Sequence, residues 1–120
     1  MQPQLLVRKT TLLSYLFHLN NNKIVLTERG TIIPYGNLIL DLRNVIDMIE
    51  LGYPVMMDCT HTCQSLKPNQ ETTSGNVELA PIYAQAVAIC GVKSFFAEIY
   101  ENPIEAKSDS STSLDFASFE

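Results

Sequence analysis

Short apolar runs and longer periodic segments alternate along the chain. Three runs, K-I-V-L-T at 23–27, P-V-M-M at 54–57 and S-F-F-A-E-I at 94–99, are rich in aliphatic, β-branched or aromatic residues. The first run is bounded by three asparagines before it and by Gly30 after it. Runs of this length and composition are typical of buried strands, so the pattern predicts a strand in each of the three places.

The segments between these runs have the pattern of helices. In the second half of 37–52, aliphatic residues recur at spacings of three and four, at Leu42, Val45, Ile46 and Ile49. Residues 77–90 are rich in alanine, with Pro81 near the first turn and Gly91 after the end, both of which helices tolerate there. The order strand, helix, strand, helix, strand predicts βαβ units, and therefore an α/β fold with a parallel sheet.

Two polar segments complete the pattern. Residues 61–75 contain Pro, Asn, Ser, Thr and Gly and are predicted to form a loop. Residues 108–120 are rich in serine and are predicted to be a loop or a frayed end.

Composition narrows the class of protein. A chain of 120 residues with 46% apolar residues can bury the core of one small domain. The net charge is −5 and the eight basic residues are scattered, which argues against nucleic-acid and anionic-membrane partners. No apolar run reaches membrane-spanning length and the N-terminus lacks the order of a secretory signal, so we expect a cytoplasmic protein. Three cysteines, an odd number, fit reduced thiols better than disulfides.

The carboxyl ends of the predicted strands carry candidate functional residues. Arg29, His61 and Glu98 lie at or just after these ends, where parallel α/β folds bind ligands. Arg29 beside Gly30 could hold a phosphate or carboxylate, or it could form a surface salt bridge with Glu28 or Asp41. The alternative for the whole set is solvated polar residues that end strands.

The segment M-D-C-T-H-T-C-Q, residues 57–64, leaves several interpretations open. His61 could be a metal ligand, a general acid or base, an anion donor or a structural residue. Cys59, His61 and Cys63 alternate, which would suggest zinc in an extended segment, but the four ligands of a structural zinc site are absent. Cys90 is expected in the core, and His18 on the surface or in packing.

Five blocks of the sequence resemble those of one family. They are T-E-R-G-T (27–31), Y-G-N-L-I-L-D-L-R (35–43), M-D-C-T-H-T-C-Q (57–64), T-S-G (73–75) and A-E-I-Y-E-N-P with K-S-D-S (97–110). In order and spacing they resemble the 3-deoxy-D-manno-octulosonate 8-phosphate synthases. The members of this family are transferases with a (β/α)₈ barrel fold. They join phosphoenolpyruvate to arabinose 5-phosphate and release phosphate, in the synthesis of the inner sugar of bacterial lipopolysaccharide.

The resemblance implies roles for individual residues. Arg29 resembles the arginine that binds the phosphate of phosphoenolpyruvate. His61 resembles the histidine over the enolpyruvate, which in metal-dependent members also ligates a divalent ion such as Mn, Fe or Zn. Glu98 and Asp109 resemble the carboxylate ligands of that metal. Cys59 and Cys63 occupy an alanine and a valine position of the family, which implies that both thiols are packing residues.

The resemblance covers the C-terminal part of the family only, whereas a full barrel needs at least about 200 residues. It therefore implies a partial (β/α)₈ barrel over residues 1–120, with an internal deletion near 16–22 and a Ser-rich tail at 108–120. The family's Gly-Pro-Cys or Gly-Pro-Asn loop, its Lys-Ala-Asn-Arg-Thr-Ser motif and its Lys-Lys-Gly-Gln motif are not found in the chain. The matched region also departs from the family where Tyr100 stands for a histidine, where Ser110 stands for a glycine and where Ile33-Pro34 stand for Phe-Gly.

These departures bear on activity. An incomplete barrel has unpaired strand edges and an exposed interior face, so we expect the chain to be inactive alone and to form a homo-oligomer. The alternatives are a noncatalytic remnant that binds a phosphate ligand or a partner, and the related synthases that use erythrose 4-phosphate or make sialic acid.

Overall fold

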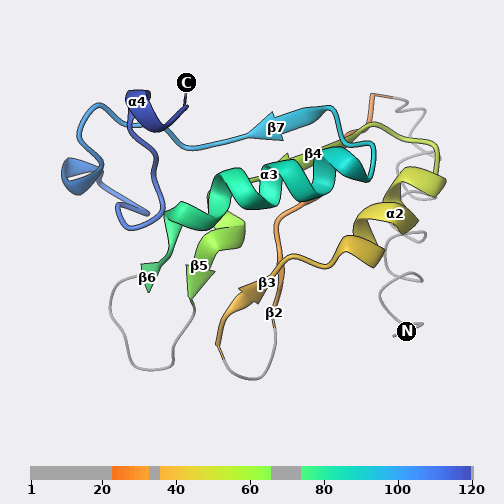
Figure 1. Cartoon of the computed structure of the whole chain (residues 1–120), viewed down its shortest axis with the longest axis horizontal. Helices are drawn as coiled ribbons and strands as arrows, with labels where there is room; N and C mark the ends of the chain where they lie inside the picture. Colours follow the sequence, from red (N-terminus) through yellow and green to blue (C-terminus); the bar gives the residue numbers. More distant parts are fainter. Residues whose placement is uncertain (1–22, 33–35, 66–73, 120) are drawn as a thin grey trace.

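The computed structural model describes residues 23–32, 36–65 and 74–119. Its centre is a three-stranded parallel sheet in the order β1 (Leu26–Glu28), β4 (Val55–Asp58) and β7 (Ser94–Phe96) (Figure 1). Helix α2 (Leu42–Glu50) connects β1 to β4, and helix α3 (Ala80–Ile89) connects β4 to β7. The predicted α/β fold of βαβ units is therefore confirmed, and each predicted strand overlaps an observed one.

Local sequence explains where the helices begin and end. The side chain of Asp41 caps α2 by accepting from the backbone N–H groups of Arg43 at 3.0 Å and Asn44 at 3.4 Å. After α2, Gly52 adopts a φ of 80°, and after α3, Gly91 adopts a φ of 105°, a left-handed conformation that favours glycine. Pro81 lies in the first turn of α3, where its missing N–H has no intrahelical partner to lose.

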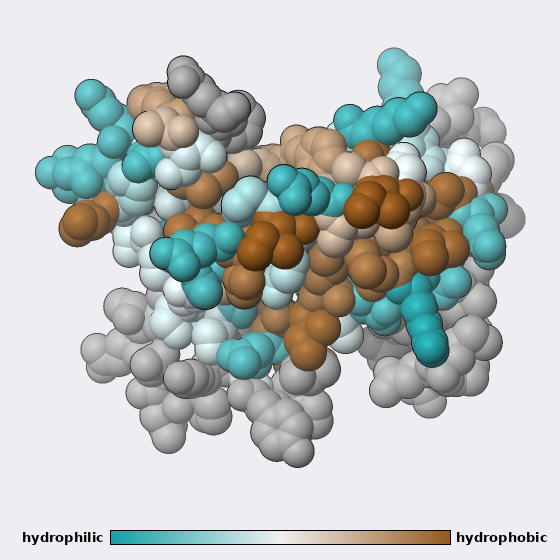
Figure 2. All heavy atoms as spheres, viewed as in Figure 1, coloured by the Kyte–Doolittle hydropathy of each residue, from teal (hydrophilic) through white to brown (hydrophobic). Residues whose placement is uncertain are grey.

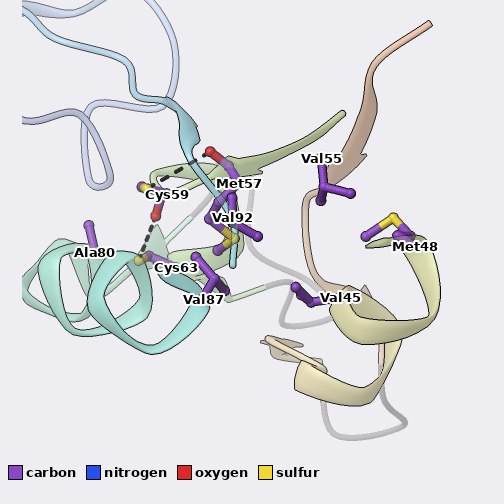
Figure 3. Close-up of a cluster of buried hydrophobic side chains, with 9 residues drawn as sticks. All are labelled: Val45, Met48, Val55, Met57, Cys59, Cys63, Ala80, Val87 and Val92. Carbon is purple, nitrogen blue, oxygen red and sulfur yellow. Dashed lines mark hydrogen bonds between the residues drawn. The ribbon is translucent and has the colours of Figure 1, made fainter. Parts of the chain in front are cut away.

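The hydrophobic core lies between the sheet and the two helices (Figure 3). Val45 and Met48 from α2, Met57 from β4 and Val87 from α3 are at most 2% exposed. Burial of each such side chain stabilises the fold by about 1.5–3 kcal/mol. This core fixes β4 between its neighbours and so fixes the carboxyl edge of the sheet.

Two small antiparallel pairs were not predicted from the sequence. β2 (Thr31–Ile32) pairs with β3 (Leu38–Ile39), and β5 (Gln64–Ser65) pairs with β6 (Ser74–Gly75). The segment predicted as a loop at 61–75 thus contains a 3₁₀ turn, η1 (His61–Cys63), and two strands. Strands of two residues are too short to show a period in the sequence.

The C-terminal segment is more ordered than a frayed end. Thr112 is fully buried, Ser113 is 6% exposed, and Leu114 forms a parallel bridge with Ile99. A short helix, α4 (Phe116–Phe119), follows. Of the two alternatives predicted for this segment, the loop holds for residues 112–114 and the frayed end does not, because a polar composition does not reveal that hydroxyl groups are satisfied by a local turn. His18 and the deletion near 16–22 lie outside the described residues.

Apolar side chains also reach the surface. Figure 2 shows them over α2 and α3, and they include Ile46, Ile82 and Ile89, the last of which is 88% exposed. At the sheet, Phe95 and Phe96 of β7 are 46% and 40% exposed. Within the described ranges, β1 and β7 pair with β4 only, so each has an open outer edge. None of the described helices is long and apolar enough to cross a membrane.

Candidate functional site

The site lies at the carboxyl edge of the sheet. β1 ends at Glu28 and β4 ends at Asp58, while Glu98 follows two residues after the end of β7. Because the strands are parallel, these three ends lie at one edge. The structure brings His61, Glu98 and Asp109 together there, and Arg29 lies beside them.

His61 is held by Asp58 through both its backbone and its ring. The backbone N–H of His61 donates to Oδ1 of Asp58 at 3.0 Å, and ring Nδ1 lies 2.9 Å from Oδ2 and 3.1 Å from Oδ1. Phe96 stacks against the ring, with centroids 6.1 Å apart and an interplanar angle of 17°. These contacts fix the imidazole with its Nε2 atom toward the two other carboxylates.

Glu98 and Asp109 face that nitrogen. Nε2 of His61 lies 3.5 Å from Oε1 of Glu98 and 3.9 Å from Oδ2 of Asp109. One ligand atom from each of the three residues falls within 4.8 Å of the others, so the group could hold a metal ion. An imidazole and two carboxylates suit a borderline or hard divalent cation.

Hydrogen bonds to the backbone of Glu98 and of Asp109 hold these two residues in place. The N–H of Glu98 donates to Oγ1 of Thr60 at 3.1 Å, and its carbonyl accepts from the N–H of Leu114 at 2.9 Å. Asp109 has a φ of 50°, and its carbonyl accepts from the N–H groups of Thr112 at 2.9 Å and Ser113 at 3.0 Å. The chain therefore turns at Asp109 and presents its side chain toward His61.

The left-handed residue of this turn is Asp109. Ser110 stands where the 3-deoxy-D-manno-octulosonate 8-phosphate synthases have a glycine. It is not among the described non-glycine residues with positive φ. Serine at that position therefore introduces no left-handed strain.

Arg29 lies at the rim of the site. Its side chain is 55% exposed, and Nε is 3.9 Å from Oδ2 of Asp58. The ion-pair partner is thus Asp58, rather than the predicted Glu28 or Asp41. The carboxylate of Glu28 instead accepts from the N–H of Gly30 at 3.0 Å and from the side chain of Asn44. The exposed guanidinium can approach an anion.

The two cysteines of the same segment point away from the site. Cys59 and Cys63 are 5% and 6% exposed and belong to the hydrophobic core (Figure 3). Sγ of Cys63 donates to the carbonyl of Cys59 at 3.1 Å. Because η1 is a 3₁₀ turn and not an extended segment, the alternation of Cys59, His61 and Cys63 does not place them on one face. Burial raises the pKa of each thiol to about 11, which keeps both protonated.

Two residues of the site were not singled out from the sequence. Asp58 orients His61, and Gln64 donates from Nε2 to Oδ1 of Asp109 at 2.5 Å. Both lie in the segment 57–64 that contains His61, so their closeness to His61 in the sequence was the signal that could have identified them. The interaction of Gln64 depends on the return of the chain at Asp109, which no local pattern reveals.

The fold and this group of side chains define part of a (β/α)₈ barrel with its candidate site at the carboxyl ends of the strands. A family model described as the DAHP synthetase I family matches residues 8–120, and the chain belongs to that family.

Named relatives support the resemblance found in the sequence. The chain is 43% identical over 96 residues to the 2-dehydro-3-deoxyphosphooctonate aldolase of Protochlamydia amoebophila, covering 80% of this chain and 35% of the relative. It is 39% identical over 97 residues to the protein of the same name from a Synechococcus strain, covering 81% of this chain and 34% of that one. This name denotes 3-deoxy-D-manno-octulosonate 8-phosphate synthase, so the resemblance is confirmed.

Solved structures support the fold. A crystal structure of phospho-2-dehydro-3-deoxyheptonate aldolase (DAHP synthase) from Thermotoga maritima matches with a TM-score of 0.68 and 30% identity, covering 90% of this chain and 30% of that one. The chain thus spans about a third of the length of the relatives that it matches. The predicted partial barrel is confirmed.

Proposed function

We propose that the chain contributes the phosphoenolpyruvate-binding and metal-binding part of a 3-deoxy-D-manno-octulosonate 8-phosphate synthase. The whole protein would be a cytoplasmic transferase that condenses phosphoenolpyruvate with arabinose 5-phosphate, for lipopolysaccharide synthesis. The observation that carries the proposal is the meeting of His61, Glu98 and Asp109 beside the exposed Arg29 at the carboxyl edge of the sheet.

Arg29 would bind the phosphate of phosphoenolpyruvate. A planar guanidinium donates two parallel hydrogen bonds to a phosphate, and the side chain of Arg29 is more than half exposed. Gly30 has a φ of 96°, and a Cβ there would lie 3.0 Å from Cβ of Leu38. The turn after β1 therefore needs glycine, and this turn sets the direction in which Arg29 leaves the strand.

His61, Glu98 and Asp109 would hold a divalent cation, Mn²⁺, Fe²⁺ or Zn²⁺. The donor set fits, because it offers one imidazole nitrogen and two carboxylates around a shared space. A bound cation would supply Lewis-acid orientation of the attacking water or of the sugar carbonyl. The residues of this chain contribute the fixed imidazole and the carboxylate charge.

The first test is phosphate release by the purified chain, given phosphoenolpyruvate and arabinose 5-phosphate with and without Mn²⁺. If the chain assembles a working site, release requires both substrates and is lost in Arg29→Ala. Arg43→Ala, which changes an exposed arginine on α2, is the matched control and should leave release unchanged. We expect the wild-type chain to release no phosphate, and that result would show that the chain does not catalyse the reaction alone.

The second candidate function is binding of a phosphate ligand without turnover. It is favoured by the exposure of Arg29, whose guanidinium lies at the rim of the site and can approach an anion. Calorimetric titration with phosphoenolpyruvate distinguishes the two functions. Binding that weakens about 10- to 100-fold in Arg29→Ala, without phosphate release, would support the noncatalytic function. Equal affinity of wild type and variant would contradict the role of Arg29 in both.

A homo-oligomer is also part of the proposal. Its support is apolar surface: Ile82 and Ile89 on α3 are exposed, as are Phe95 and Phe96 along the open edge of β7. Exposed apolar patches and open strand edges are common at interfaces between copies. Sedimentation should give a mass above that of one chain, and a monomer at micromolar concentration would contradict the assembly.

A further inference from the structure

Asp58 is buried at the point where β4 ends, with 7% of its side chain exposed. Its carboxylate makes three close approaches to His61: Oδ1 accepts from the backbone N–H, and both oxygens lie within 3.1 Å of Nδ1. Among the described residues, its other ion-pair partner is Arg29, whose side chain is 55% exposed and whose Nε lies 3.9 Å from Oδ2. The closest polar contacts of the Asp58 carboxylate are therefore those with His61.

An ionised carboxylate only accepts hydrogen bonds, so Nδ1 of His61 must carry the proton between them. In the neutral ring, the lone pair then lies on Nε2. That atom is 3.5 Å from Glu98 and 3.9 Å from Asp109, distances too long for well-formed hydrogen bonds. Two carboxylates repel a nitrogen lone pair that faces them, and a metal cation held among the three groups would replace this repulsion with attraction.

We propose that Asp58 is a positioning residue that fixes the Nδ1–H tautomer of His61 and so presents the Nε2 lone pair to the cation held with Glu98 and Asp109. The proposal rests on the metal-binding part of the proposed function. It adds Asp58, which acts on the cation only through His61, and it gives a role to the buried carboxylate at the end of β4.

The variant Asp58→Asn tests this directly. The backbone N–H of His61 requires an acceptor, so the oxygen of the introduced amide should take the place of Oδ1. The NH₂ group then faces Nδ1 and donates to it, which favours the Nε2–H tautomer. This variant should reverse the tautomer while leaving the volume of the side chain nearly unchanged.

The tautomer is measured by nitrogen NMR of protein with ¹⁵N-labelled histidine rings, without added metal. The pH is chosen high enough that the ring signals no longer change with pH. The chain has two histidines, so His18→Gln assigns the signals of His61. We expect Nδ1–H in the wild type and Nε2–H in Asp58→Asn. Asp47→Asn on α2 is the matched control and should keep Nδ1–H. The Nε2–H tautomer in the wild type would overturn the proposal, whether or not any variant folds.

Mn²⁺ affinity, measured by electron paramagnetic resonance, separates this inference from the proposed function. We expect Asp58→Asn to weaken Mn²⁺ binding about 10- to 100-fold, as loss of such a partner does in other metal sites. If the wild type binds no Mn²⁺ but the tautomer reverses in Asp58→Asn, the metal site fails and the tautomer-fixing role of Asp58 stands. If Mn²⁺ binds equally to both proteins, the positioning role is overturned while the metal site stands.

Discussion

The side chain of Gln64 donates from Nε2 to Oδ1 of Asp109 at 2.5 Å, although the two residues are 45 positions apart. Gln64 begins β5, directly after the turn that carries His61, and Asp109 begins the turn that buries Thr112. This bond joins the two segments that face each other across the candidate metal site. The position of the Asp109 carboxylate therefore depends on the packing of the C-terminal segment as well as on the sheet.

Asp109→Asn should weaken Mn²⁺ binding at least about tenfold without unfolding the chain. Asparagine tolerates the left-handed conformation at a φ of 50°, and its side-chain oxygen can still accept from Gln64. Only the carboxylate charge is lost. Titration with Mn²⁺ checks the affinity, and a urea unfolding curve checks that stability is retained.

Asp109→Ala separates the two roles of the residue. Alanine in a left-handed conformation costs about 1–2 kcal/mol, so this variant should lose stability as well as affinity for the metal. Equal unfolding free energies for the alanine and asparagine variants would argue against a strained turn at Asp109.

Gly75→Ala should destabilise the chain by more than the about 1–3 kcal/mol typical of overpacking. An added Cβ would overlap Cγ2 of Thr112 and lie 2.6 Å from the carbonyl oxygen of Cys63, which is backbone and cannot move freely. Gly52→Ala is the comparison, because a Cβ there meets nothing within 4 Å and only its φ of 80° opposes the change. Urea unfolding of both variants measures the difference. If Gly75→Ala is no more destabilising than Gly52→Ala, the close packing of β6 against the C-terminal segment is not present in solution.

The local elements of the fold could be predicted from the sequence, whereas the contacts of the C-terminal segment could not. β4 follows from its apolar run and α2 from its periodicity, and Arg29, His61, Glu98 and Asp109 were proposed from strand ends and from a family resemblance. The burial of Thr112 beside Gly75 could not be found this way, because a serine- and threonine-rich segment has the composition of a loop. Its hydroxyl groups are satisfied by the carbonyl of Asp109 only once the turn has formed.

The roles of Asp58 and Gln64 were missed for a related reason. An aspartate at a strand end and a glutamine directly after the next turn are ordinary residues in such places. Their significance comes from geometry: Asp58 lies 2.9 Å from Nδ1 of His61, and Gln64 contacts a residue on a distant segment. A hydrogen-bond partner that is distant in sequence leaves no periodic signal.

The free energy of unfolding should fall as the pH rises from about 9 to about 11. Burial raises the pKa of the Cys59 and Cys63 thiols from 9.0 to about 11. In that window the unfolded chain has released these protons and the folded chain still holds them, so the unfolded state binds fewer protons and is increasingly favoured. Below pH 9 both states hold them, and the contribution to stability is fully present. The double variant Cys59→Ala/Cys63→Val lacks both thiols and is the control, because other groups titrate in the same window. Urea unfolding of both proteins at several pH values isolates the effect, and a stability difference that stays constant from pH 8 to 11 would show that the thiols are not buried.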